Sequence, residues 1–179
     1  MTSHDIVPSA DVVRLATPTV AQIHVLAELL IDCVEGGASV SFMHPLSMAR
    51  ALAFWRGIAD DVTTGARALL VAEDLGRIVG TVQLVLDQPE NQPHRADVSK
   101  MLVHRRARRR GVGAALMGAA EQLARELGKT LLVLDTASAD AERLYARLGW
   151  QLCGVIPGYA LLPQGRLCAT SYFYRTLND

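Results

Sequence analysis

Residues 108–114 read Arg-Arg-Arg-Gly-Val-Gly-Ala and join a strand-like segment, 95–103, to an apolar helical run, 112–127. A loop that leads into a helix presents backbone N–H groups without partners, at the positive end of the helix dipole. Gly111 and Gly113 carry no Cβ, so an anion can approach the backbone closely, and the arginines add positive charge. We therefore interpret this loop as a binding site for a phosphate or diphosphate group.

Other interpretations of the loop are tested by its spacing and by the overall charge. The pattern Gly111-x-Gly113-x-x-Leu116 lacks the third glycine of a dinucleotide fingerprint, and the chain contains no Gly-x-x-x-x-Gly-Lys-Ser/Thr motif. The arginines of 105–110 could mimic a basic patch for nucleic acid, but eighteen Lys and Arg balance eighteen Asp and Glu. We expect no nucleic-acid partner. A solvated basic loop that only caps the helix stays open on the glycines alone.

Hydrophobic periodicity on both sides of the loop predicts an α/β protein. Apolar residues at spacings of three and four predict helices, and short β-branched or aliphatic runs between turn signals predict strands. The predicted strands are 11–16, 68–72, 78–86, 95–103, 130–134, 150–156 and 169–175, and the predicted helices are 19 to the glycines at 36–37, 47–62, 112–127 and 140–148. A strand-helix-strand unit with a parallel pair follows. Since no linker or repeat interrupts the chain, we expect 1–179 to be one domain with its core at about 12–177.

Composition and motif searches argue against a disulfide, metal or membrane protein. The cysteines, Cys33, Cys153 and Cys168, are odd in number and have no Cys-x-x-Cys spacing, and the latter two look like buried strand residues. The five histidines have no metal-ligand spacing. No apolar run reaches the roughly 18 residues of a membrane span, and no signal peptide is recognisable. We expect a cytoplasmic protein with reduced thiols, no metal and no membrane partner.

Two motifs resemble the GNAT superfamily of N-acetyltransferases. The family's coenzyme A motif, Arg/Gln-x-x-Gly-x-Gly/Ala after a strand, is matched by Arg108-x-x-Gly111-x-Gly113. Its second motif, a strand, a helix with Leu-Tyr and then Leu-Gly-aromatic, is matched by 132–136 and 144–150. The resemblance covers nearly the whole chain and implies the GNAT acyl-CoA N-acyltransferase fold, of α/β (α+β) class. That fold has a mixed, mostly antiparallel sheet of six to seven strands, a splayed parallel pair at the fourth and fifth, and about four helices.

A closer resemblance is to the tabtoxin-resistance acetyltransferases. It is carried by 36–40 with Phe42-Met43, Arg95-Ala96, 134–136 and Pro157-Gly-Tyr159. The first and last of these segments face the acceptor in that family. The resemblance implies transfer of the acetyl group of acetyl-CoA to a primary amine of a small molecule, such as an amino-acid-like toxin or antibiotic, by direct attack in a ternary complex. Phe42 and Tyr159 are expected to line the acceptor pocket, although such residues are more often core.

The resemblance also implies which residues contact acetyl-CoA. They are Met101, Leu102 and Val103 on the fourth strand, Arg108, Arg109, Arg110, Gly111, Val112, Gly113 and Ala114 in the loop and helix start, and Ser138 and Asp140 near the cofactor's far arm. A backbone N–H at a splayed point within 101–103 is expected to stabilise the negative charge that develops on the acetyl oxygen. The same backbone should pair with the pantetheine amides like an added strand.

Three residues are candidates for proton transfer. An alkyl ammonium has a pKa near ~10, so a carboxylate, or a water it holds, must accept a proton before the amine can attack. The tabtoxin-resistance pattern has a Glu and an Asp at the positions of Asp97 and Asp135, and Asp97 is one methylene shorter than the Glu. Tyr145 matches the tyrosine that protonates the departing thiolate. An ion pair or helix cap for the acids, and simple packing for Tyr145, are the alternatives.

Other functions stay open at this stage. A protein N-terminal or lysine acetyltransferase would need an open groove for its peptide. The arginines of 105–110 could belong to a nucleic-acid or regulatory module, and Asp97 in place of Glu leaves open a protein that binds acetyl-CoA without turnover. A homodimer is also compatible with the sequence, which does not determine the oligomeric state.

Overall fold

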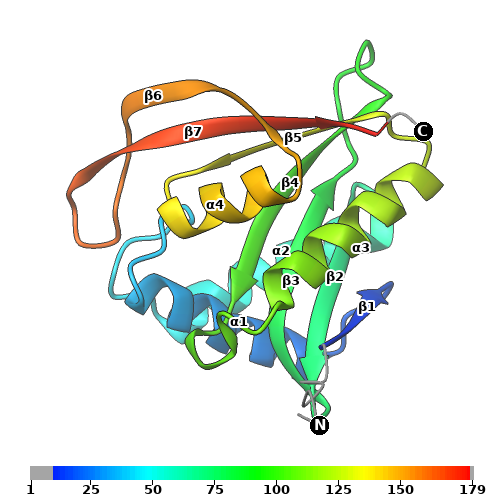
Figure 1. The fold of residues 1–179 in the computed structure, drawn as a ribbon. Coiled ribbons are helices and arrows are strands. Elements are labelled where there is room, and N and C mark those ends of the chain that lie inside the picture. Colours follow the sequence, from blue (N-terminus) through cyan, green and yellow to red (C-terminus); the bar gives the residue numbers. More distant parts are fainter. Residues whose placement is uncertain (1–9, 178–179) are drawn as a thin grey trace, which may run out of the picture.

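The computed structural model describes residues 10–177, which form one seven-stranded sheet and four α-helices (Figure 1). The strands are β1 (Asp11–Leu15), β2 (Arg67–Asp74), β3 (Arg77–Val85), β4 (Arg95–Val103), β5 (Leu131–Thr136), β6 (Gln151–Leu161) and β7 (Leu167–Thr176). The helices are α1 (Val20–Glu35), α2 (Met48–Thr64), α3 (Val112–Glu126) and α4 (Ala139–Arg147), with a short 3-10 helix at Arg105–Ala107. The predicted elements are therefore present, in the predicted order.

The sheet is antiparallel except at its centre. Its strand order is β1-β2-β3-β4-β5-β7-β6, and β4 with β5 is the parallel pair. These two strands pair only where 95–97 of β4 faces 131–133 of β5. Beyond that point they part, which leaves unpaired backbone groups in the middle of the sheet. The predicted mixed sheet with a splayed parallel pair is confirmed.

A β-bulge lies where the two central strands part. On β3 and β4, Thr81 faces Leu102 while Gln83 faces Ser99, so β4 has one extra residue in this interval. Lys100 lies within it and has a φ of +50°, in the left-handed region that is uncommon for a residue with a side chain. The bulge thus begins one residue before the range 101–103 expected from the sequence.

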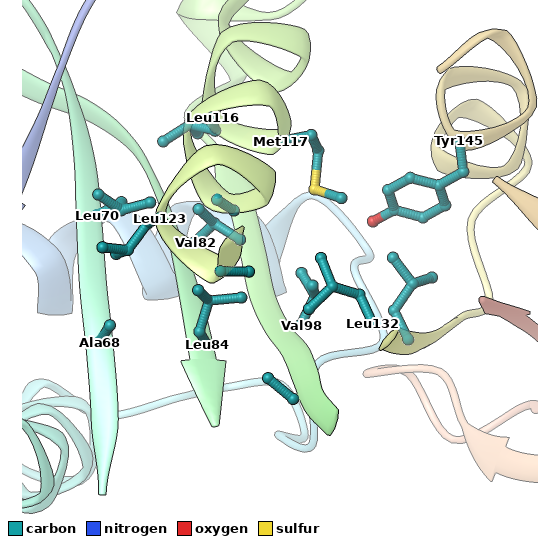
Figure 2. Packing of buried hydrophobic residues seen from close by; sticks show 14 of the residues in the cluster. Ala68, Leu70, Val82, Leu84, Val98, Leu116, Met117, Leu123, Leu132 and Tyr145 are labelled. Carbon is teal, nitrogen blue, oxygen red and sulfur yellow. The ribbon is translucent and has the colours of Figure 1, made fainter. Parts of the chain in front are cut away.

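Helices cover both faces of the sheet. On one face α3 packs over the central strands, and Figure 2 shows its side chains Leu116 and Leu123 near Leu70, Val82 and Leu84 of the sheet. On the other face α1 and α2 pack over a second apolar cluster that includes fully buried leucines and a tryptophan, namely Leu26, Leu29, Leu30 and Trp55. Burial of these two clusters holds the sheet rigid around the opening between β4 and β5.

Local signals explain where the first two helices begin and end. Thr19 and Gln22 form a reciprocal capping box at the start of α1, with the Gln22 N–H 3.2 Å from the Thr19 Oγ1. Ser47 caps α2 by accepting the Arg50 N–H. Gly65 ends α2 in the left-handed conformation, with a φ of +81°. These caps are readable in the sequence, which is why both helices were predicted closely.

The last hairpin differs from the prediction. β6 continues through Pro157-Gly158, which the sequence suggested as a loop, and the register with β7 shifts between Ile156 and Ala160. Cys153 is exposed, so the expectation that it is buried is wrong. The reason is that β6 is the edge strand and is exposed along almost its whole length.

Cysteines and metal-ligating side chains form no special site in the part of the chain that the structure describes. Cys33 is buried and Cys168 half-buried, and all three cysteines are free thiols. No group of three His, Cys, Asp or Glu side chains within 10–177 is placed to hold a metal ion. None of the helices in the same residues is long and apolar enough to cross a bilayer.

Candidate active site

The start of α3 presents free backbone donors. Gly111 is the N-cap with a φ of +80°, and no side chain caps the helix. The first helical hydrogen bond runs from the Ala115 N–H to the Gly111 carbonyl, at 3.0 Å. The amides of Val112, Gly113 and Ala114 therefore lie in the first turn, where a helix offers them no acceptor. Together with the helix dipole they suit an anionic group.

Gly113 keeps the space beside this helix start open. A Cβ at Gly113 would lie 3.0 Å from Leu144 Cδ2 and 3.8 Å from Met101 Sδ. The first turn of α3 thus borders side chains from α4 and from β4. The Leu144 side chain would have to shift to admit a Cβ, and the absence of one lets a ligand approach the backbone more closely here.

Arg105 links the arginine-rich loop, residues 105–110, to α1 through hydrogen bonds and ion pairs. Its backbone N–H and its Nε donate to the carboxylate of Asp32 at 2.9 and 2.8 Å, and its Nη2 lies 3.3 Å from Glu35. Burial alone would raise the pKa of Asp32, but the hydrogen bonds from Arg105, together with the charges of His104 and Arg105, outweigh it and hold that pKa below its usual range. Arg105 is consequently a structural residue whose charge is compensated.

The following arginines divide into two kinds. Arg110 forms an ion pair with Asp74 of β2 at 3.0 Å. Arg108 donates through Nε to the Val103 carbonyl at 3.2 Å. Neither Arg108 nor Arg109 has a carboxylate partner among residues 10–177, so these two cations are available to an anionic ligand.

A cavity of about 860 Å³ extends from this helix start between α1, β4 and α4. Its lining contains nearly all of the predicted acetyl-CoA residues, namely Met101, Leu102, Val103, Arg108, Arg109, Gly111, Val112, Gly113, Ala114, Ser138 and Asp140. Arg110 is the exception, because its guanidinium is turned to Asp74. Within the cavity wall the Ser138 hydroxyl accepts the Ala141 N–H and so caps α4, and Asp140 pairs with Arg143.

Sequence reasoning missed two arginines in this cavity. Arg143 and Arg147 line it from α4, and the segment 36–40 lines it from the end of α1. The two arginines are four residues apart and therefore share one helix face. This spacing was the available signal, but it did not indicate which face of α4 points to the cavity.

A second cavity, of about 390 Å³, lies beside the opening and is lined by residues of both β4 and β5. It shares wall residues with the first cavity, namely Ser39, Val40, Met101, Thr136 and Ala137. Met101 follows the bulge of β4 and Thr136 ends β5. The two cavities therefore meet where β4 and β5 part.

The two predicted acceptor-pocket residues both line the smaller cavity. Phe42 packs edge-on against Phe54 of α2, with ring centroids 5.2 Å apart. The Tyr159 hydroxyl lies 2.8 Å from that of Tyr172 on β7. The cavity is thus walled by the loop before α2 and by the β6–β7 hairpin.

The two candidate carboxylates lie in different surroundings. Asp135 lines the smaller cavity, and its Oδ2 accepts a hydrogen bond from the Thr170 hydroxyl at 2.9 Å. Asp97 lines neither cavity. Its Oδ1 pairs with Arg95, and its Oδ2 accepts from the Gln88 side chain at 3.3 Å. The ion-pair alternative considered for Asp97 is the arrangement observed.

Tyr145 lies buried at the wall of the smaller cavity. Figure 2 shows its hydroxyl pointing from α4 toward α3, on the side of Met117. The ring also packs against Trp150 and Phe173, with centroids 5.9 and 5.7 Å away. Burial raises the pKa of the phenol, and the charge of Asp135 adds to the effect, so the proton stays on the oxygen at neutral pH.

Lys100 is a further charged residue of the cavity that sequence reasoning missed. Its Nζ donates to the Ser41 hydroxyl at 3.1 Å and lies 5.9 Å from the centre of the Phe54 ring. Burial lowers the pKa of this ammonium, Arg67 lowers it further, and Asp135 opposes the shift. A lysine inside the strand-like segment 95–103 was visible, but the splayed point was expected within 101–103, so Lys100 itself was not expected in the cavity.

Known structures share this architecture. A phosphinothricin acetyltransferase of Sinorhizobium meliloti in complex with acetyl-CoA is similar with a TM-score of 0.79 at 20% identity, over 96% of this chain and 90% of that one. The yncA protein of Salmonella typhimurium, solved with its cofactor acetyl-CoA, has a TM-score of 0.76 at 18% identity, over 95% and 96%. A ribosomal-protein-alanine N-acetyltransferase of Brucella melitensis has 0.76 at 21%, over 93% and 99%.

The family is established by the sequence itself. Residues 28–150, more than half of the chain, match the model of the acetyltransferase (GNAT) family. This range contains the bulged β4, the cradle at the start of α3, and α4 with its tyrosine. The chain therefore belongs to the acetyltransferase (GNAT) family and is an acetyl-CoA-dependent acetyltransferase.

Proposed function

We propose that this enzyme acetylates a primary amine of a small molecule by direct attack in a ternary complex. The observation that carries the proposal is the meeting of the two cavities at the opening between β4 and β5. Bound acetyl-CoA supplies a thioester carbonyl, to which a neutral amine adds and from which coenzyme A leaves as thiolate. An amine in the smaller cavity would reach that carbonyl where the two cavities share wall residues.

Different residues of the larger cavity are proposed to bind different parts of acetyl-CoA. The amides of 112–114 and the free cations Arg108 and Arg109 take the diphosphate. Unpaired backbone of β4 beyond Asp97 can hydrogen-bond the pantetheine amides as an added strand would. An N–H near Met101 is the candidate donor to the acetyl oxygen as negative charge develops there.

Asp135 is the preferred acceptor of the amine proton. It lines the acceptor cavity and has one hydrogen-bond partner, Thr170. Asp97 is held by Arg95 and Gln88 and lies outside the cavity wall, so a part in proton transfer would need it to leave both partners. Asp135 takes the proton directly or through a water molecule.

Tyr145 is the proposed proton donor to the departing thiolate. It lies at the wall of the acceptor cavity, and its raised pKa keeps it protonated until a base forms beside it. Burial of the ring between α3 and α4 fixes the direction of the hydroxyl. A fixed donor needs little reorganisation when the thiolate forms.

The size and walls of the acceptor cavity support a small molecule. Its volume of about 390 Å³ lies at the small end of typical ligand sites. Phe42 and Tyr159 come from two separate segments and wall it. Similar folds are found in enzymes named for phosphinothricin and for ribosomal-protein alanine, so the fold does not select the acceptor. We therefore rest the small-molecule proposal on the cavity, and extend it to amino-acid-like toxins or antibiotics as acceptors on the tabtoxin-resistance motifs.

An acceptor screen tests the proposed function. Thiol release from acetyl-CoA is measured with small amines, amino acids, antibiotics and short peptides, for wild type and for Asp135→Asn. We expect release with a small amine and at least a roughly hundredfold loss of kcat in the variant, as removal of a general base predicts. Release only with peptides would favour protein acetylation. Tight acetyl-CoA binding without release for any acceptor would overturn the proposal.

We also propose that the enzyme is a homodimer that pairs through β6. This edge strand exposes apolar side chains, including Leu152, Val155 and Ile156. An exposed edge with apolar side chains readily pairs with another strand, and the same strand of a second copy provides a twofold-symmetric partner. Because Tyr159 lies on β6 and lines the acceptor cavity, such a contact would stabilise the wall of the site.

A further inference from the structure

We infer that Lys100 binds an anionic group of the acceptor, so that the acceptor is an amine that also carries a carboxylate. This inference rests on the proposed function, because it concerns the same cavity. It makes Lys100 a specificity-determining residue for the acceptor.

The ammonium of Lys100 lacks a counter-ion within the described chain. Its hydrogen-bond partner is the neutral Ser41 hydroxyl at 3.1 Å, and the Phe54 ring lies beneath it at 5.9 Å. No carboxylate of residues 10–177 forms an ion pair with it. A half-buried charge without a counter-ion is costly, and a ligand anion would compensate it.

Arg67, the cation next to Lys100, has its charge compensated by a carboxylate, so Lys100 is the one that can bind a ligand. Arg67 of β2 donates to Asp61 at 2.8 Å and to the Gln83 side chain at 3.0 Å. Arg67 nevertheless adds to the lowering of the Lys100 pKa, and only Asp135 opposes that lowering. Within residues 10–177, Lys100 is the only lysine or arginine of this cavity wall and has no carboxylate partner, so a ligand anion can pair with it.

The carboxylate of the cavity wall is placed for an amine. Asp135 closes β5 and lines the cavity together with Lys100, while Thr170 supports its carboxylate. A molecule with an amine and a carboxylate can place the amine at Asp135 and the carboxylate at Lys100. An uncharged or purely cationic amine would leave the ammonium of Lys100 uncompensated. The charges of this cavity therefore favour an amino-carboxylate, independently of any sequence motif.

Paired acceptors test the inference. Each amino acid is compared with its amide, which keeps the amine and side chain and removes the negative charge. Thiol release from acetyl-CoA is measured for wild type, Lys100→Met and Lys129→Met. Lys129 is the other lysine of the chain, lines neither cavity and donates to the Pro93 carbonyl at 2.7 Å, so its substitution controls for net charge.

We expect wild type and Lys129→Met to prefer the carboxylate member of each pair. Lys100→Met should raise KM for that member about tenfold to a hundredfold, as loss of a charge-assisted hydrogen bond predicts, and leave the amide unchanged. Lys100→Arg, which keeps the charge, should restore part of the preference. An equal loss for both members in a folded Lys100→Met variant, or a wild-type preference for amides, would overturn the inference.

A binding measurement separates this inference from the proposed function. Calorimetric titration of the same pairs into coenzyme A-saturated enzyme reports the preference without turnover. If no acceptor releases thiol, the proposed function fails. Tighter binding of the carboxylate member, lost in Lys100→Met, would still support the role of Lys100, and equal binding of both members would overturn it.

Discussion

Tyr145 combines a packing role and a proposed chemical role in one side chain, and the two can be separated at the level of the residue. Tyr145→Phe keeps the ring between Trp150 and Phe173 and removes only the hydroxyl. We expect kcat to fall about a hundredfold or more, which is the usual contribution of a general acid, with unchanged acetyl-CoA affinity. Steady-state kinetics and calorimetry measure both. A folded variant with wild-type kcat would contradict the proton-donor role and show that Tyr145 contributes only packing.

The stabilising effect of Asp32 on the fold is expected to depend on pH. Its pKa is held below the usual value, so its stabilising contribution is present above about pH 4 and is lost as pH falls through the lowered pKa. Asp32→Asn should therefore reduce the free energy of unfolding by about 1.5–3 kcal/mol at pH 7. The difference from wild type should shrink in acid. Urea unfolding at pH 7 and pH 3 measures it, and an equal difference at both pH values would contradict the ion-pair account.

Residues of the candidate site could be predicted from the sequence where their part in it depends on the local backbone and not on distant contacts. Gly111, Gly113 and the adjoining amides follow from the spacing of the loop, since a helix start supplies donors whatever the distant contacts are. Arg110 and Asp97 were expected in the site but form ion pairs with Asp74 and Arg95. Such pairings depend on which strands become neighbours, and no local pattern reports that.

At the scale of the element, most boundaries follow from local chemistry. The caps Thr19 and Ser47 and the stop at Gly65 set the ends of α1 and α2. β6 is the contrary case, because Pro157-Gly158 predicts a turn while pairing with β7 extends the strand to Leu161. Tertiary pairing outweighs local preference there, as is common for strands.

The exposed face of α3 carries a stability prediction. Gly118 lies in the helix interior, is exposed, and has nothing within 4 Å of the position of a Cβ. Gly118→Ala should raise the free energy of unfolding by about 0.5–1 kcal/mol, because alanine restricts the unfolded chain and favours the helix. Urea denaturation checks this value. A decrease would mean that this face of α3 is in contact with something that the alanine disturbs.

At the scale of the whole molecule, the exposed β6 edge predicts the oligomeric state. Val155→Lys places a charge on the proposed contact strand and should convert a dimer to a monomer in light scattering after size exclusion. Leu75→Lys is the matched control, because Leu75 is also exposed and apolar but lies in the β2–β3 turn. A monomeric wild type, or a dimer that both variants keep, would contradict pairing through β6.

We propose that the start of α3, beside the opening between β4 and β5, binds acetyl-CoA. Calorimetric titration of acetyl-CoA into wild type, Gly113→Val and Gly118→Ala tests it most directly. A Cβ at Gly113 lies 3.0 Å from Leu144 Cδ2, so the larger valine crowds that side chain, whereas a Cβ at Gly118 on the same helix meets open space. We predict unchanged affinity for Gly118→Ala and at least a roughly hundredfold loss for Gly113→Val, from overpacking and lost contacts to the diphosphate. Wild-type affinity in a folded Gly113→Val variant would contradict the account.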